Sequence, residues 1–316
     1  MEFKNAKSFA AALAATVLLT LLAAAVPFAG MLFLPLVPQP ALGFGLTHGI
    51  PSTALLLGLA AAIIVYVAGV EVGAAFVLIA LMALVLLHAF ARRWPIEAAA
   101  GAAAAAMLAG LAACLAFFFG PPSDVFHGVQ YFLQENLKAT LDLYAGAGFS
   151  PETVERIRQQ GPQIVATLVS VLPALAFGSF ITLVLINIFF LLRRFPGRRD
   201  EIAGVRDLRE WRAPEWLVWV FLGGGFLLLV PGLDAGRVVA LNILLAASVV
   251  YFFHGLSIVA YYFHHKSVPR LLRGFIYLAI FFEQILTIAV VALGLFDLWG
   301  DFRRLKKKNL NPNPAA

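Results

Sequence analysis

Charged residues are scarce in this sequence, and cysteine is nearly absent. Asp, Glu, Lys and Arg make up 13% of the 316 residues, whereas soluble domains carry roughly 25%. The single cysteine, Cys114, excludes a disulfide framework and a cysteine metal cluster. Hydrophobic residues, in contrast, make up 62% of the chain, and the mean hydropathy is +0.90. A soluble core cannot absorb this excess, so the composition predicts an integral membrane protein.

The apolar residues gather in runs of the length that crosses a bilayer. A membrane helix needs about 20 apolar residues, and eight runs are candidates: 8–29, 51–70, 74–91, 96–119, 163–192, 214–232, 237–263 and 271–298. A ninth run, 33–49, is shorter and contains three prolines, so it is expected either as a short crossing helix or as a broken or re-entrant segment. We therefore expect an all-α fold, a polytopic transmembrane helix bundle with eight or nine membrane helices.

Lys and Arg cluster at five places, which sets the expected orientation. The clusters hold 19 of the 23 basic residues: Lys4 and Lys7, Arg92 and Arg93, Arg193 to Arg212, Lys266 to Arg273, and Arg303 to Lys308. Basic loops face the cytosol, which predicts a cytosolic N-terminus and favours a crossing by 33–49. Three apolar segments follow Arg212, yet both later clusters belong on the Arg212 side. One of these segments must fail to cross, or the rule fails at one end, and the sequence does not identify which.

The runs divide the chain into four parts: N-terminal transmembrane helices over 1–120, a polar insert over 121–161, C-terminal transmembrane helices over 162–300 with a basic cytosolic loop at 193–213, and a basic tail over 301–316. Apolar residues recur at helical spacing in the insert, which predicts an amphipathic helix. Ser150 before Pro151 predicts the start of a second, short helix. The insert is expected outside the cytosol, either packed on the bundle or lipid surface, or as a lid over an outward-facing cavity.

Small residues on two helices predict close contacts between helices. They recur at every fourth position, as Ala98, Ala102, Ala106 and Gly110, and as Ala10 and Ala14. Small side chains let two helix backbones approach closely within a membrane. These six residues are therefore expected to mediate helix packing.

Polar residues inside the apolar runs are the candidates for a binding site. Glu283 and Gln284 lie near the middle of the run 271–298. An ionised acid at a helix centre costs roughly 3 kcal/mol, so Glu283 is expected to face the bundle interior, either in a binding site or as a protonated acid bonded to a neighbouring helix. His254 shares a helical face with Tyr251 and is either a ligand or a buried histidine bonded to a neighbour.

Motifs for catalysis are missing from the sequence. It contains no HExxH, no GxSxG and no phosphate-binding loop, so we predict no catalytic residue, no metal site, no cofactor and no enzyme activity. The basic residues are explained by membrane topology and by attraction to anionic lipid heads. Nucleic-acid binding would need a basic polar surface, and little such surface is expected.

Three stretches of the C-terminal third carry a family resemblance: "LREWRAPEWLVWVF" (208–221), "LNILLAASVVYFFHGLSIVAYYF" (241–263) and "GLFDLWGDFRRL" (294–305). They resemble the YybS-like family, bacterial polytopic membrane proteins grouped as a domain of unknown function. The matching positions are Arg209, Trp211, Pro214, Glu215, Asn242, Gly255, Asp297 and Trp299. That family commonly has glutamine where this chain has His254, which weakens an obligatory catalytic or metal role for the histidine.

The first half is similar in its rhythm of apolar helices to the substrate-binding (S) subunits of energy-coupling-factor transporters. The resemblance implies a multi-pass protein of the bacterial cytoplasmic (inner) membrane, in which Ala10 and Ala14 correspond to a face that docks an energising transporter module. We therefore expect a transporter-like binding subunit for a small organic molecule, with a cavity lined by Glu283, Gln284, Tyr251 and His254. The alternative is a membrane scaffold or regulatory protein that holds a cytosolic partner through its arginine-rich loop.

Overall fold

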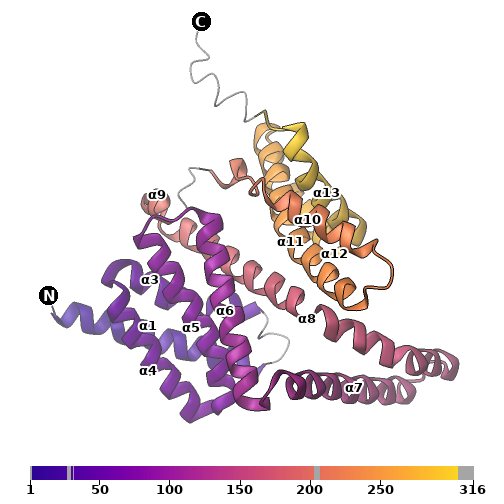
Figure 1. The fold of residues 1–316 in the computed structure, drawn as a ribbon. Coiled ribbons are helices and arrows are strands. Elements are labelled where there is room, and N and C mark those ends of the chain that lie inside the picture. The colour runs from indigo at the N-terminus through magenta and orange to yellow at the C-terminus, as the bar shows by residue number, and fades with distance from the viewer. Residues whose placement is uncertain (1, 27–29, 31, 203–206, 305–316) are drawn as a thin grey trace, which may run out of the picture. The chain divides into compact units, whose positions relative to one another are not determined.

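The structure is a computed structural model that describes residues 2–26, 30, 32–202 and 207–304 (Figure 1). Every regular element in these ranges is a helix. Six of the helices are long and apolar enough to cross a membrane, and a bent helix pair makes a seventh if it counts as one span. The expected all-helical fold is confirmed, whereas the expected count of eight or nine spans is not. Part of the basic loop and most of the basic tail, residues 203–206 and 305–316, lie outside the described residues.

Two of the expected spans are shorter in the structure than their apolar runs. The run 33–49 forms a 3-10 turn, Leu34–Leu36, and then α3, Gln39–His48. Pro38 and Pro40 stand at the start of α3, where a missing N–H costs nothing, but they prevent one continuous helix. The run 214–232 forms α10, Leu217–Leu228, which ends shortly before Pro231.

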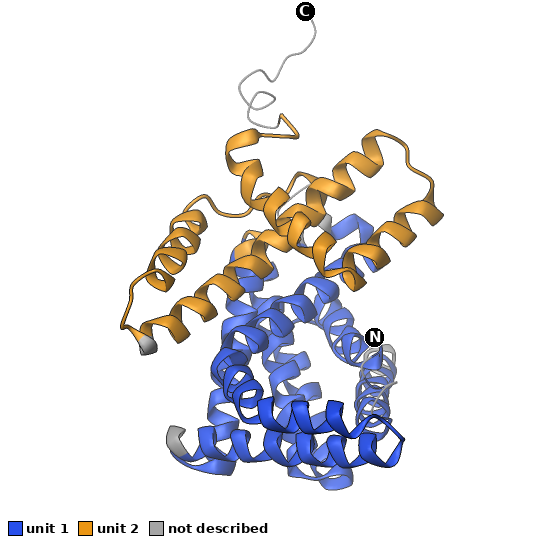
Figure 2. Ribbon diagram, turned by 90° about the vertical axis from the view of Figure 1, so that its right-hand side faces the viewer, with its two compact units in different colours: residues 1–94, 98–202 blue, residues 95–97, 203–316 orange. Residues whose placement is uncertain are grey.

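The chain folds into two compact units, coloured separately in Figure 2. The first unit comprises residues 1–94 and 98–202, and the second comprises residues 95–97 and 203–316.

The core of the first unit lies among its long apolar helices. Its apolar helices are α1 (Glu2–Ala25), α4 (Ile50–Ala68), α5 (Val70–Ala91) and α6 (Ile96–Phe119). Helix α4 turns into α5 at Gly69, whose φ of 90° favours glycine. Phe76 and Met82 of α5 are fully buried, as is Leu56 of α4. This packing makes α4 and α5 the centre of the unit.

Helix α3 brings the chain back to the N-terminal end of α1. Ser8 Oγ lies 3.2 Å from His48 Nε2, and the rings of Phe9 and Phe44 pack edge to face. Gly43 packs against the guanidinium of Arg194. A Cβ added to this glycine would lie 3.6 Å from the guanidinium carbon. The segment 33–49 thus returns the chain through the unit, with α3 as a half-length helix.

The polar insert forms a helical hairpin. Helix α7, Pro122–Gly146, is the expected amphipathic helix, and α8 begins at Pro151 with Ser150 as its N-cap, accepting a hydrogen bond from the Thr153 N–H. The expectation that this second helix is short is wrong, because α8 continues through Pro162 and Pro173 to Arg194. Its 44 residues correspond to a length of about 66 Å. Two short elements follow, a 3-10 turn Pro196–Arg198 and α9, Arg199–Ile202.

The second unit contains a 3-10 turn, Leu208–Glu210, followed by α10, α11 (Asp234–His265), α12 (Arg270–Phe282) and α13 (Gln284–Gly300). Helices α11 and α13 cross at two glycines. A Cβ on Gly255 would lie 2.0 Å from the Val290 carbonyl oxygen, and one on Gly294 would lie 2.1 Å from the Tyr251 carbonyl oxygen. Only glycine permits this backbone approach.

The apolar run 271–298 is not the single helix that its composition predicts. It bends by 100° between α12 and α13, where Glu283 has an extended backbone. The hydroxyl of Thr287 donates to the carbonyl of Ile280 across the bend at 2.6 Å. Such side-chain hydrogen bonds satisfy backbone groups that a break in a membrane helix leaves exposed.

Candidate functional site

The second unit contains a buried cluster of ionisable side chains. Arg303 Nη2 lies 2.9 Å from Asp297 Oδ2, and both side chains have no exposed surface. His254, also fully buried, places Nε2 at 2.9 Å from Arg303 Nη2 and 3.2 Å from Asp297 Oδ2. Buried charged groups are stable only when they are paired and hydrogen-bonded. Here the Arg303 guanidinium and the Asp297 carboxylate form such a pair.

Arg303 joins three segments that are distant in sequence. Its Nη1 donates to the carbonyls of Arg209 at 2.7 Å and Trp211 at 3.0 Å. The same nitrogen lies 3.0 Å from Ser257 Oγ on α11, while Nη2 holds Asp297 on α13. One guanidinium therefore ties the segment before α10 to α11 and α13.

One nitrogen of the His254 ring faces both charges of the cluster. Nε2 lies within hydrogen-bond distance of the Arg303 guanidinium, a donor, and of the Asp297 carboxylate, an acceptor. Within the described part of the chain Nδ1 has no hydrogen-bond partner. His254 is thus a buried histidine bonded to its neighbours, one of the two alternatives that the sequence left open.

Two further ion pairs lie beside the cluster. Arg212 pairs with Asp301, and Arg209 Nε donates to Asp207 at 2.8 Å. Partial burial raises the pKa of the Asp207 carboxyl, but the hydrogen bonds and charge of Arg209 outweigh this and hold the pKa below its ordinary value. Burial lowers the pKa of Arg212. The Arg212–Asp301 pair links the segment before α10 to the end of α13, whereas the Arg209–Asp207 pair is local. In the first unit, Arg198 donates to the Leu46 carbonyl.

Several residues that the family resemblance singled out meet at this cluster. The backbone of Arg209 and Trp211 and the side chain of Asp297 belong to it, and Gly255 lies at the adjacent helix crossing. The other matching residues lie apart from the cluster. Pro214 and Glu215 follow residues 209–211 in the sequence, and Trp299 is exposed. Asn242 donates to the Val238 carbonyl within α11.

The four expected binding residues are not in one environment. His254 belongs to the ion cluster, and Tyr251 is fully buried beside Phe221 with no partner for its hydroxyl among the described residues. Glu283 and Gln284 are exposed at the break between α12 and α13, so Glu283 does not face the interior of its unit as expected. The structure therefore separates a closed ion cluster from an exposed polar break.

The expected helix-contact residues are distributed over exposed and packed faces. Ala10, Ala14 and Ala98 are exposed, while Ala102 and Ala106 are half-buried. Gly110 packs closely, because a Cβ there would lie 2.8 Å from Leu81 of α5. The buried face of α6 is the adjacent one, which carries Ala99, Ala103 and Met107.

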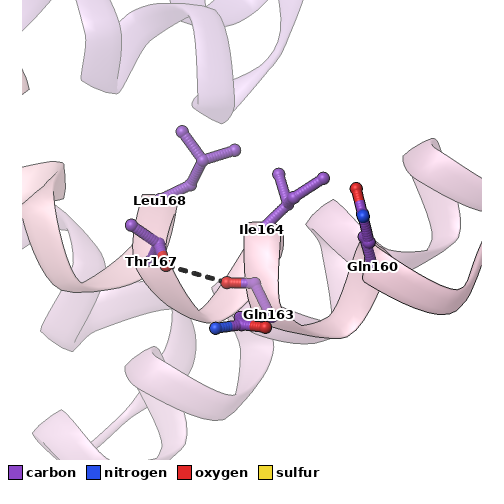
Figure 3. Close-up of a pocket in the computed structure, with 5 residues that line it drawn as sticks. All are labelled: Gln160, Gln163, Ile164, Thr167 and Leu168. Atoms are coloured by element: carbon purple, nitrogen blue, oxygen red, sulfur yellow. Dashed lines mark hydrogen bonds between the residues drawn. The ribbon is translucent and has the colours of Figure 1, made fainter. Parts of the chain in front are cut away.

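Two cavities lie in the first unit. One has a volume of about 370 Å³ and runs along a single face of α8; Figure 3 shows its lining residues, Gln160, Gln163, Ile164, Thr167 and Leu168. A second, of about 530 Å³, lies between α1, α3 and α4 beside Phe44 and His48. Neither is lined by an expected binding residue. No group of three or more His, Cys, Asp or Glu side chains that could hold a metal occurs among the described residues.

Sequence reasoning missed two members of the ion cluster. The sequence pattern does not single out Ser257, and it assigns Arg303 to the basic tail because the arginine follows the last apolar run. A local signal is the short distance in sequence between Asp297 and Arg303 at the end of that run. It does not predict their pairing, because residues six positions apart do not face each other on a helix, and the pair depends on the turn at Asp301.

The fold and this site define a multi-helix membrane protein that resides in a lipid bilayer. The sequence model of the family described as "Predicted membrane protein (DUF2232)" matches residues 14–298, and the chain belongs to this family. Comparison with curated proteins and with solved structures finds no match.

Proposed function

We propose that this protein is a transporter-like binding protein for a small polar organic molecule and that the break at Glu283 and Gln284 is its binding element. The single observation that carries the proposal is this break, which places a carboxylate and an amide between two apolar helices. Broken helices and intramembrane acids mark substrate and ion sites in membrane proteins.

The lengths of the two helices support a site inside the bilayer. Helix α12 has 13 residues and α13 has 17, which correspond to about 20 Å and 25 Å. Each is shorter than the roughly 30 Å of the hydrocarbon core. These lengths favour a joint in the membrane interior over one in a loop in water.

The polarity of the break suggests the chemistry of its ligand. The last carbonyls of α12 and the Glu283 carboxylate are negative, while the first N–H groups of α13 are positive. Gln284 offers both a donor and an acceptor. A small molecule with a cationic group and an anionic or carbonyl group is complementary to both sides.

Energy for transport would come from another protein or from the solute gradient, since the sequence has no nucleotide-binding motif. The exposed Ala10 and Ala14 on α1 are compatible with docking of an energising module, as the resemblance to S subunits implies. The distribution of Lys and Arg supports a cytosolic N-terminus, and the resemblance to bacterial families implies the bacterial cytoplasmic membrane.

Native mass spectrometry of the protein extracted from its own membrane tests the proposal. The expected result is a retained small molecule in the wild type and in the control Glu135→Gln, whose acid is exposed on α7, but not in Glu283→Gln. Equal retention in both variants would remove Glu283 from the site. An empty protein with a stoichiometric protein partner would favour the scaffold alternative through the arginine-rich loop.

A further inference from the structure

The two ends of the α12–α13 pair are bound to consecutive residues of α11. At the entrance, the Val268 N–H donates to the Phe263 carbonyl at 3.0 Å. At the exit, the Tyr262 hydroxyl donates to the Phe302 carbonyl at 2.8 Å. Both residues of α11 lie in its last turn, before it ends at His265. The pair therefore begins and ends near the same end of α11.

A pair that crosses the membrane would not have this geometry. Its two ends would be separated by about 30 Å of hydrocarbon, whereas ends tied to neighbouring residues of one helical turn are much closer. The bend of 100° at Glu283 is what returns α13 toward the end of α11. The hydrogen bond from Thr287 to Ile280 holds the two halves at this bend.

The ion cluster fixes the exit on the side of the basic loop. Arg303 binds the carbonyls of Arg209 and Trp211, which precede α10. Helices α10 and α11 then form the outward and return arms of a hairpin, with its turn near Leu233. The segments 209–212, 266–269 and 302–303 consequently lie on one membrane face.

We infer that α12–α13 is a re-entrant helix pair, which enters the membrane and leaves on the face of entry, with Glu283 at its tip. This accounts for the charge pattern, because the basic loop and the two basic clusters that follow it then lie on one side, as the rule for positive loops requires. The segment that fails to cross after Arg212 is then 271–298. The inference concerns the path of the chain and stands whether or not Glu283 binds a ligand.

Cysteine labelling tests this path, because Cys114→Ser gives a chain without cysteine. Single cysteines are then placed by Ser267→Cys in the turn before α12, by Arg304→Cys after α13, and by Leu233→Cys at the start of α11. All three positions are exposed. Each variant is treated with a membrane-impermeant maleimide in intact cells and in inside-out vesicles.

The expected result is that positions 267 and 304 react from one face and position 233 from the other. Labelling of 267 and 304 from opposite faces would overturn the inference, because the pair would then be a broken span. Labelling of 233 and 267 from one face would also overturn it, because α11 would not cross. If either variant accumulates poorly, Lys266→Cys and Phe302→Cys probe the same two segments. No ligand is used, so this test can fail independently of the binding proposal.

Discussion

Arg303 and Asp297 form an ion pair of 2.9 Å in which neither side chain has exposed surface. They are six positions apart in the sequence, and Asp301 adopts a left-handed backbone between them, with φ of 39°. This turn reverses the chain after α13 so that Arg303 points back into the unit. Asp297 also accepts a hydrogen bond from the Phe302 N–H at 2.8 Å. Asp297 therefore both caps the turn and neutralises the charge of Arg303.

Arg303→Met should strongly destabilise the second unit. It leaves the Asp297 carboxylate buried without its charge partner, and breaking a buried pair in this way costs about 3–5 kcal/mol. The double variant Arg303→Met with Asp297→Leu should recover part of the loss, because it removes both charges. Thermal unfolding in detergent measures the effect, with Arg304→Met, an exposed neighbour, as the control. A single variant as stable as this control would contradict the structural role of the pair.

His254→Gln should be better tolerated than His254→Leu. A glutamine side chain has both a donor and an acceptor and can bond with Arg303 or Asp297 in place of imidazole Nε2, whereas leucine can bond with neither. An unsatisfied buried polar group costs about 1–3 kcal/mol, and denaturant unfolding of the two variants measures the difference. Equal stability of the two would show that the hydrogen bond at Nε2 contributes nothing.

Gly255→Ala should disrupt the crossing of α11 and α13. The added Cβ would lie 2.0 Å from the Val290 carbonyl oxygen, which is backbone and cannot move aside as a side chain would. Overpacking of this kind costs about 1–3 kcal/mol. Gly225→Ala on α10 is the matched control, since a Cβ there meets nothing within 4 Å. The measurement is the unfolding temperature of both variants, and a similar temperature for the two would rule out the close crossing.

The class of protein and the positions of most helices follow from the sequence, because long apolar runs leave few alternatives to membrane helices. The cap at Ser150 was predictable for a local reason, since its hydrogen bond reaches only Thr153. The bend at Glu283 could not be predicted, because the pattern of the run 271–298 predicts one apolar helix and hydropathy does not indicate a break in the backbone.

The ion cluster was beyond sequence reasoning for a different reason. His254 and Arg303 are 49 residues apart, and Ser257 and Arg303 are 46 apart. Only packing of α11 against α13 brings them together, and that packing depends on two glycines. A single sequence shows the charges and the glycines, but not their pairing.

Asp207 should make stability depend on pH in the acid range. Its pKa in the folded protein lies below the ordinary 3.8, so its contribution is present above that value and is lost as the pH falls through the lower, folded pKa. The wild type should therefore unfold at a higher temperature than Asp207→Asn near pH 6, and the gap should shrink toward the folded pKa. Thermal scans at several pH values measure it, and a constant gap would exclude the pair with Arg209 as its cause.

Thr287→Val should loosen the bend that separates α12 from α13, whereas Thr287→Ser should preserve it. The hydroxyl donates to the Ile280 carbonyl at 2.6 Å across the break, and valine has a similar shape but no donor. The loss of one such bond costs about 1 kcal/mol when the carbonyl finds water, and more when it does not.

The effect of the two Thr287 variants is measured as the rate at which a small maleimide labels Gln284→Cys in the chain without Cys114. A looser bend should expose the tip more often, so labelling should be faster in Thr287→Val and unchanged in Thr287→Ser. Equal rates in all three backgrounds would mean that the bend is held by packing alone. In that case the break would be a rigid element, and any ligand would have to enter a preformed site at Glu283.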